Sequence, residues 1–268
     1  MPHHTSHAHR HAPTAAPVTE PARMPLPQYS LARILGTWAA AALPMAALAW
    51  VVAPWLAGSF EGTSALPRAI ILSLTAGLVW QFGIVMVLVR REQGSMRWAV
   101  VKEALWLRAP HSPRTGRRGG KLWLILIPLV LGVAAMEVLP GLPVPSGRDL
   151  GMFLDSPAGQ DFLAGNWAWF AVILTMFVFN TVLGEELLFR GLLLPRMHGQ
   201  FGRWDWVANG VLFTAYHLHV PWAMPKVVVD TFVLAYPSRR YQSAIVGIAV
   251  HSAQSVVFTA LVLALVLR

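Results

Sequence analysis

Three short stretches in the second half of the chain hold side chains that could do chemistry. Glu185, Glu186 and Arg190 follow directly on an apolar run. His217 and His251 lie in two later apolar stretches. An ionisable side chain at membrane depth is costly in free energy, so it usually marks a functional site. We therefore examine these stretches first.

The first stretch offers two adjacent carboxyl groups that could take different roles. Glu186 and Arg190 are four residues apart with the acid first, so they can pair on one face of a helix. Adjacent helical residues point about 100° apart, which leaves Glu185 free to face elsewhere. Two carboxyl groups with different partners can serve separate acid and base functions. The simpler alternative is a helix end where charges meet lipid headgroups.

The second stretch centres on a histidine. Phe213 and His217 are four residues apart and share one helix face. A neutral histidine near a carboxylate can hold or activate a water molecule. His219 lies almost opposite, near Pro221, and we expect it at the membrane interface. Taken alone, His217 also fits an interior histidine with its hydrogen bonds satisfied.

The third stretch lies within the last apolar run. His251 and Ser255 are four residues apart and share a face, with Gln254 beside it. The structural alternative is that these side chains form hydrogen bonds between helices, which Ser, Gln and His all supply in membranes.

In this order, the three stretches resemble the CAAX prenyl protease and bacteriocin-processing family of intramembrane endopeptidases. The family pattern is Glu-Glu-x-x-x-Arg, then Phe-x-x-x-His, then His-x-x-x-Asn. The matching residues here are Glu185, Glu186, Arg190, Phe213, His217 and His251. The resemblance covers residues 167–260. One departure is that Ser255 stands in the place of the family's Asn, with Gln254 one step before it.

The resemblance implies a glutamic peptidase whose catalytic residues are Glu185, His217, His251 and Ser255. Glu185 would act as general base on a water that His217 orients, while His251 and Ser255, or Gln254, would bind the developing oxyanion. The supporting residues would be Glu186, Arg190, Phe213 and Gln254. The substrate would be a membrane-associated protein or peptide, such as a prenylated tail or a precursor peptide. No cofactor is expected on this interpretation.

Other functions remain open. Glu185, His217 and His251 could instead bind zinc with one open position for water, although there is no His-Glu-x-x-His signature. Ser255 would suit a catalytically weak family member that acts as a membrane interaction or immunity protein. Buried carboxylates and histidines also serve as proton relays in transporters.

The composition indicates the elements that position these residues. Of the 268 residues, 56% are hydrophobic and only 12% are charged, against about 25% charged in soluble domains. We predict an all-α, polytopic transmembrane helix bundle with about seven spans, six to eight being the range. The predicted spans are residues 31–57, 66–89, 122–139, 167–194, 206–220 and 244–267, and residues 227–236 form a short, tilted or re-entrant piece.

The charge pattern suggests an orientation. The net charge is +9, and residues 90–121 are rich in Lys and Arg with only Glu92 and Glu103 as acids. Positive loops stay on the cytoplasmic side, which also places the N-terminus inside. Within this loop, residues 98–107 could form a short helix on the membrane. Because the positive charges lie between apolar runs, we exclude nucleic acid as a partner.

The predicted organisation is a tail and one membrane domain. Residues 1–30 are rich in His and Pro and should form a disordered cytoplasmic tail. Residues 31–268 should form the transmembrane domain, in contact with lipid, in what we expect to be a bacterial plasma membrane. The chain has no Cys, which excludes disulfides, a thiol nucleophile and thiolate metal ligands.

Overall fold

The computed structural model describes residues 26–136 and 142–268, and within these ranges the regular structure is entirely helical. Four helices are long and apolar enough to cross a membrane. They are Leu31–Ala57, Ala65–Gln93, Trp167–Arg196 and Ala244–Val266. The predicted all-α membrane bundle is confirmed in this coarse form, whereas the predicted count of about seven spans is not.

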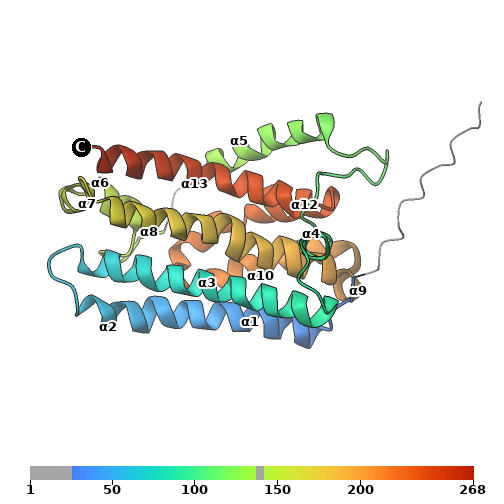
Figure 1. Ribbon diagram of the computed structural model, residues 1–268, viewed down its shortest axis with the longest axis horizontal. Helices are drawn as coiled ribbons and strands as arrows, with labels where there is room; N and C mark the ends of the chain where they lie inside the picture. Colours follow the sequence, from blue (N-terminus) through green and yellow to red (C-terminus); the bar gives the residue numbers. More distant parts are fainter. Residues whose placement is uncertain (1–25, 137–141) are drawn as a thin grey trace, which may run out of the picture.

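The four long helices lie roughly side by side along the long axis of the molecule (Figure 1). The first is α1 (Leu31–Ala47), continued through a π-helical turn into α2 (Ala53–Ala57). The second is α3 (Ala65–Gln93), which packs between the first and the third. The third begins as α8 (Trp167–Val178), and the last is α13 (Ala244–Val266).

The third long helix changes its winding along its length. After α8 it contains two π-helical segments, Phe179–Gly184 and Leu187–Leu193, and ends in the 3₁₀ turn Leu194–Arg196. A π turn closes its hydrogen bond over one more residue than an α turn, so it shifts which side chains share a face. Such turns are frequent at functional sites.

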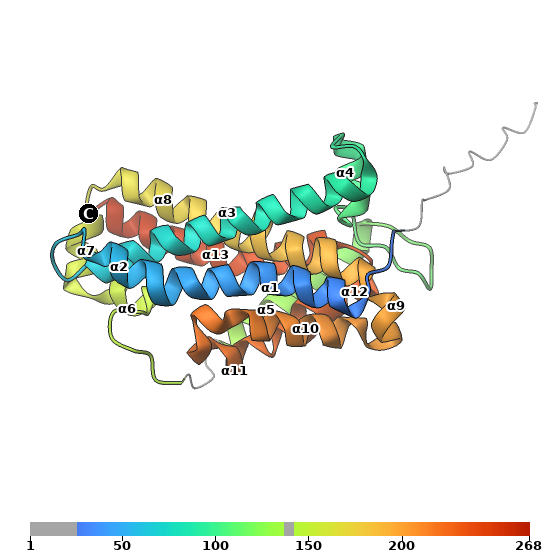
Figure 2. The ribbon, with the colours of Figure 1, turned by 90° about the horizontal axis from the view of Figure 1, so that it is seen from below.

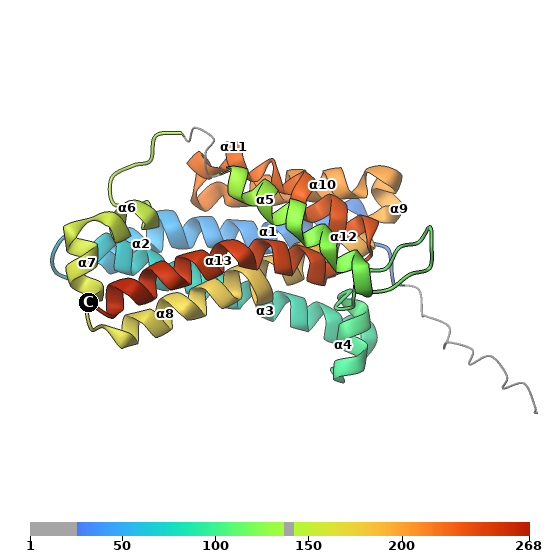
Figure 3. The same ribbon diagram turned by 90° about the horizontal axis from the view of Figure 1, so that it is seen from above.

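Shorter helices cover the faces of the long ones. α5 (Leu126–Met136) crosses α13, and α10 (Asp205–Tyr216) lies on the opposite side of the molecule from α8 (Figures 2 and 3). The remaining short helices are α4 (Trp98–Ala104), α6 (Leu150–Asp155), α7 (Pro157–Leu163), α9 (His198–Phe201), α11 (Met224–Val227) and α12 (Tyr236–Arg240).

Of the shorter predicted pieces, one ends early. The α-helix in the predicted span 206–220 ends at Tyr216 and continues as the 3₁₀ turn His217–His219, and Val220, directly before Pro221, is no longer helical. The predicted piece 227–236 consists of brief helical turns around the π segment Thr231–Ala235. The described part of the predicted span 122–139 is the helix Gly120–Met136, and its last three residues lie outside the described ranges.

The end of the predicted tail is packed rather than disordered. Residues 1–25 lie outside the described residues, but Tyr29 is only 2% exposed, and its backbone N–H donates to the Arg196 carbonyl at 2.9 Å. Burial raises the pKa of the Tyr29 hydroxyl, so this group keeps its proton and donates it to Glu92. The part of the predicted tail next to α1 therefore packs against the helix bundle.

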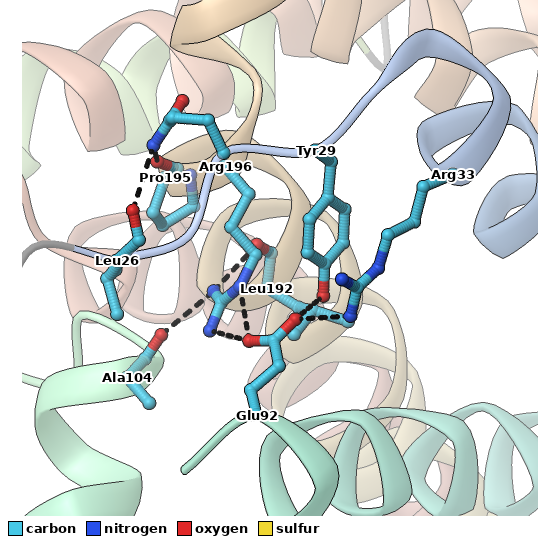
Figure 4. Close-up of polar contacts among 9 residues, drawn as sticks. Leu26, Tyr29, Arg33, Glu92, Ala104, Leu192, Pro195 and Arg196 are labelled. Carbon is cyan, nitrogen blue, oxygen red and sulfur yellow. Dashed lines mark hydrogen bonds and ion pairs between the residues drawn. The ribbon is translucent and has the colours of Figure 1, made fainter.

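Glu92, near the end of α3, joins three segments at this end of the bundle (Figure 4). Its Oε1 accepts from the Tyr29 hydroxyl and, at 2.7 Å, from the Arg33 guanidinium of α1. Its Oε2 accepts from Arg196 Nε at 2.9 Å, at the end of the third long helix. We call these four residues the Glu92 cluster. It ties the start of α1 and the ends of two long helices together.

Candidate active site

Two adjoining cavities lie where the third long helix faces α3, α13 and the segment after α10. The smaller has a volume of about 330 Å³ and the larger about 500 Å³. Glu185, His217 and His251 all line the smaller cavity, and Glu185 lines both. Three ionisable side chains from separate segments of the chain therefore meet at one space, although 32 residues or more separate each in sequence from the next.

Glu185 is held by a chain of hydrogen bonds that begins in α3. The carboxyl group is 2% exposed and bonds to the hydroxyl of Tyr216, the last residue of α10. Gln81 Nε2 in turn donates to the Tyr216 oxygen at 2.6 Å. Because the Tyr216 oxygen accepts from Gln81, its proton is available to the Glu185 carboxylate. We call this chain of hydrogen bonds from Gln81 through Tyr216 to Glu185 the relay. It holds one side of the Glu185 carboxyl group, and the other side faces the cavities.

Glu186 points away from the cavities into an ion-pair cluster. Its Oε1 lies 3.1 Å from Arg190 NH1, as the four-residue spacing predicts. The same oxygen lies 3.1 Å from His251 Nδ1, a second partner that the spacing could not reveal. The Arg190 guanidinium also stacks 3.9 Å from the centre of the Phe213 ring. Glu186 and Arg190 thereby connect the third long helix to both α10 and α13.

A glycine allows α13 to approach this cluster. A Cβ atom on Gly247 would lie 2.5 Å from Glu186 Oε2 and 2.9 Å from Ser238 Oγ. Real Cβ atoms do not come this close to other heavy atoms, so a larger residue here would force the Glu186 and Ser238 side chains to shift. The close contact keeps His251, one helical turn further along α13, within reach of Glu186.

The hydrogen bonds of the two histidines indicate which ring nitrogen faces the cavity. His217 Nδ1 lies 2.8 Å from the Phe213 carbonyl oxygen, which can only accept, so Nδ1 carries the proton. A neutral His217 ring therefore keeps a lone pair on Nε2. The Glu186 carboxylate likewise requires a proton on His251 Nδ1, which leaves the Nε2 edge of that ring for the cavity.

The comparison with protein-family models matches residues 166–257 to the family described as Type II CAAX prenyl endopeptidase Rce1-like. The match covers about a third of the chain, so it is this segment that is similar to the Rce1-like family. The predicted family resemblance is thereby confirmed. In the comparisons with curated proteins and with solved structures, no match was found. Together with the four long apolar helices, the family makes the chain a multi-pass membrane protein.

The Rce1-like segment places its two predicted oxyanion residues differently. Gln254 lines both cavities, beside Glu185. Ser255 lines only the larger one, and not the cavity that His217 and His251 share. Gln254, unlike Ser255, therefore lines the same cavity as His217 and His251.

Four polar residues at the site escaped the sequence analysis: Gln81, Asn180, Tyr216 and His219. His219, expected at the membrane interface, instead lines both cavities and stacks on His217 with ring centres 5.4 Å apart. The helix tightens to a 3₁₀ turn over His217–His219, which changes the direction of the side chain. Pro221, two residues further on, was the sequence signal that this stretch would not keep α-helical geometry.

The residues as placed do not fit a zinc ion. Among the residues that the structure describes, no group of three or more His, Asp or Glu side chains lies close enough together to hold a metal ion. The zinc-dependent alternative for Glu185, His217 and His251 therefore stays a prediction, and no metal enters the mechanism below. The predicted histidine-rich tail lies almost wholly outside the described ranges.

Proposed function

We propose that this protein is an endopeptidase that hydrolyses a peptide bond within the membrane, using a water molecule activated by Glu185. One observation carries the proposal: Glu185, His217 and His251 line a single cavity of about 330 Å³. Such a cavity has room for a water and a peptide carbonyl, since one water needs only about 30 Å³. The match of residues 166–257 to an endopeptidase family supports the same reaction.

The chemistry follows from the hydrogen-bonding capacity of each group. Water lies between the Glu185 carboxylate and His217 Nε2, which accepts one of its protons in a hydrogen bond. Glu185 removes the other proton while the water oxygen bonds to the peptide carbonyl carbon, and the carbonyl electron pair moves onto its oxygen. When that pair returns, the C–N bond breaks and Glu185 passes its proton to the leaving amine. The products are a carboxylic acid, which then loses its proton to water, and an amine.

The remaining groups support this reaction. His251, as an imidazolium whose Nδ1–H donates to Glu186, presents its Nε2–H to the carbonyl oxygen, where negative charge develops. Gln254 is placed to assist from the same helix. Glu186, Arg190 and Phe213 hold His251 and His217 in position through the contacts described above.

The surroundings of the site support a membrane-associated substrate. The larger cavity places Met45, Ile71, Leu78 and Phe258 next to Glu185, which suits a peptide with an apolar group near the cleaved bond. The family description points to prenylated C-terminal tails, and precursor peptides are the second class. The basic helix ends at α4, α9 and α12 gather at one end of the bundle, which supports a cytoplasmic N-terminus in a bacterial plasma membrane (Figure 1).

Peptide termini in membranes provide the test. Membranes from cells that express the wild-type chain should contain new peptide termini that are missing with Glu185→Gln. Glu61→Gln, an exposed loop substitution of the same kind, is the matched control and should behave as the wild type. If Glu185→Gln produced the same new termini as the wild type, the proposed function would be wrong.

A further inference from the structure

Asn180 lies at the centre of the candidate site but has no part in the mechanism so far. It belongs to the π-helical segment Phe179–Gly184, directly before Glu185. Its side chain is half-buried and lines both cavities, as Glu185 does.

The π turn brings Asn180 and Glu185 to the same side of the helix. The backbone N–H of Glu185 donates to the Asn180 carbonyl, five residues earlier, where an α-helix would use the carbonyl four residues earlier. In an α-helix, residues five apart would point about 140° away from each other. The wider turn reduces this angle, and so both side chains reach the cavities.

Gly184 permits this winding. A Cβ atom at position 184 would lie 2.5 Å from the Phe179 carbonyl oxygen and 3.3 Å from Leu78 Cδ2 of α3. Any larger residue would therefore collide with the π turn and with the neighbouring helix. Gly184 therefore permits the π turn, and the π turn sets the position of Asn180.

The Asn180 carboxamide has hydrogen-bonding capacity to spare. In the described part of the chain its side chain makes no hydrogen bond, whereas Asn209 donates to the Phe189 carbonyl at 2.9 Å. Gln254, the other amide at the cavities, already has an interaction. A half-buried amide that faces a cavity and has no partner within the protein has its donors and acceptor available to a ligand in that cavity.

Hydrolysis of a peptide creates a negative oxygen that needs more than one donor. Glu185 and His217 Nε2 are occupied with the water, which leaves His251 as a first donor. We propose that Asn180 is a second, catalytic donor whose Nδ2–H bonds the developing oxyanion. The assignment rests on the proposed function. It makes the π turn part of the active site, because the turn aligns the donor with the general base on the same helix.

The test uses the full chain in membranes and a peptide whose cleavage is lost in Glu185→Gln. Asn180→Leu removes the donor, and Asn180→Asp keeps the shape of the side chain but replaces the donor by an acceptor. Both should lower kcat by about 10²–10³-fold, the usual cost of losing one oxyanion donor. KM should stay within a few-fold, because the bond forms only in the transition state. Thr175→Ala, at an exposed position earlier on the same long helix that lines neither cavity, is the matched control and should stay within a few-fold of the wild type.

The outcomes separate the two proposals. If Glu185→Gln and the wild type cut the same peptides, the proposed function fails and the donor assignment with it. If Glu185→Gln is inactive while both Asn180 variants keep their kcat, the function stands and the assignment is overturned. A thermal unfolding midpoint close to that of the wild type shows that a variant is folded, and Asn180→Asp decides the question if Asn180→Leu unfolds.

Discussion

Two buried clusters of acids and arginines in the described part of the chain differ in a way that separates a structural ion cluster from a candidate active site. In the Glu92 cluster, both carboxylate oxygens accept hydrogen bonds from Tyr29, Arg33 and Arg196. At the second cluster, Glu186 is paired with Arg190 in a similar way, but the adjacent Glu185 borders two cavities. Burial of a charge is common to both clusters. A carboxyl group that faces a cavity distinguishes the second cluster from the first.

The largest expected effect is on turnover at the second cluster. Glu185→Gln keeps the shape of the side chain but removes the general base, so kcat should fall by about 10²–10⁴-fold. The thermal unfolding midpoint should stay close to that of the wild type, because a neutral amide is easier to bury than a carboxylate. A variant that unfolded along with its loss of activity would make Glu185 structural, like Glu92.

Glu92→Gln should have the opposite result. It leaves the buried Arg196 without its anionic partner, and breaking a buried pair in this way costs about 3–5 kcal/mol. The unfolding midpoint in detergent should drop clearly, while the fraction that remains folded should retain the wild-type kcat. Loss of turnover in folded protein would contradict the distinction between the clusters.

The next effect concerns how closely α13 approaches Glu186. Gly247→Ala places a Cβ atom against Glu186 Oε2, and overpacking of this kind costs about 1–3 kcal/mol. Gly83→Ala, in α3, is the matched control because a Cβ atom there would have no neighbour within 4 Å. Thermal unfolding of both variants measures the difference. Equal midpoints would mean that the close approach of α13 is not required.

The smallest effect is expected from the relay behind Glu185. Tyr216→Phe removes one hydrogen bond to the carboxylate, worth about 1 kcal/mol, and should lower kcat roughly 5-fold. KM should change little, since Tyr216 lines neither cavity. An unchanged kcat would show that Glu185 is positioned without the relay.

The sequence predicted those parts of the site that follow α-helical geometry. The Glu186 to Arg190 pair and the shared face of Phe213 and His217 came from a spacing of four residues, and both are present. Asn180 was missed because only a π turn brings it to Glu185, and His219 because the helix tightens to a 3₁₀ turn. Neither departure changes the pattern of apolar residues.

Contacts between distant segments were also beyond the sequence. Gln81 reaches Tyr216 across 135 residues, and Glu92 reaches Arg196 across 104. Such contacts depend on how the long helices pack, which apolar runs alone do not determine. The predicted span count is not confirmed for a related reason: apolar composition predicts burial, and a short helix can be buried among its neighbours without crossing a membrane.

The central claim is that Glu185, His217 and His251 face water inside a protein surrounded by lipid. The chain has no Cys, so single cysteines can be introduced and labelled with a charged, water-soluble maleimide. Only a thiolate reacts, and it forms only where water reaches it. Gln254→Cys, at the cavities, should therefore react quickly, whereas Val257→Cys, 60% exposed on the outside of α13, should be protected by lipid. Rapid labelling at 257 with none at 254 would contradict the account.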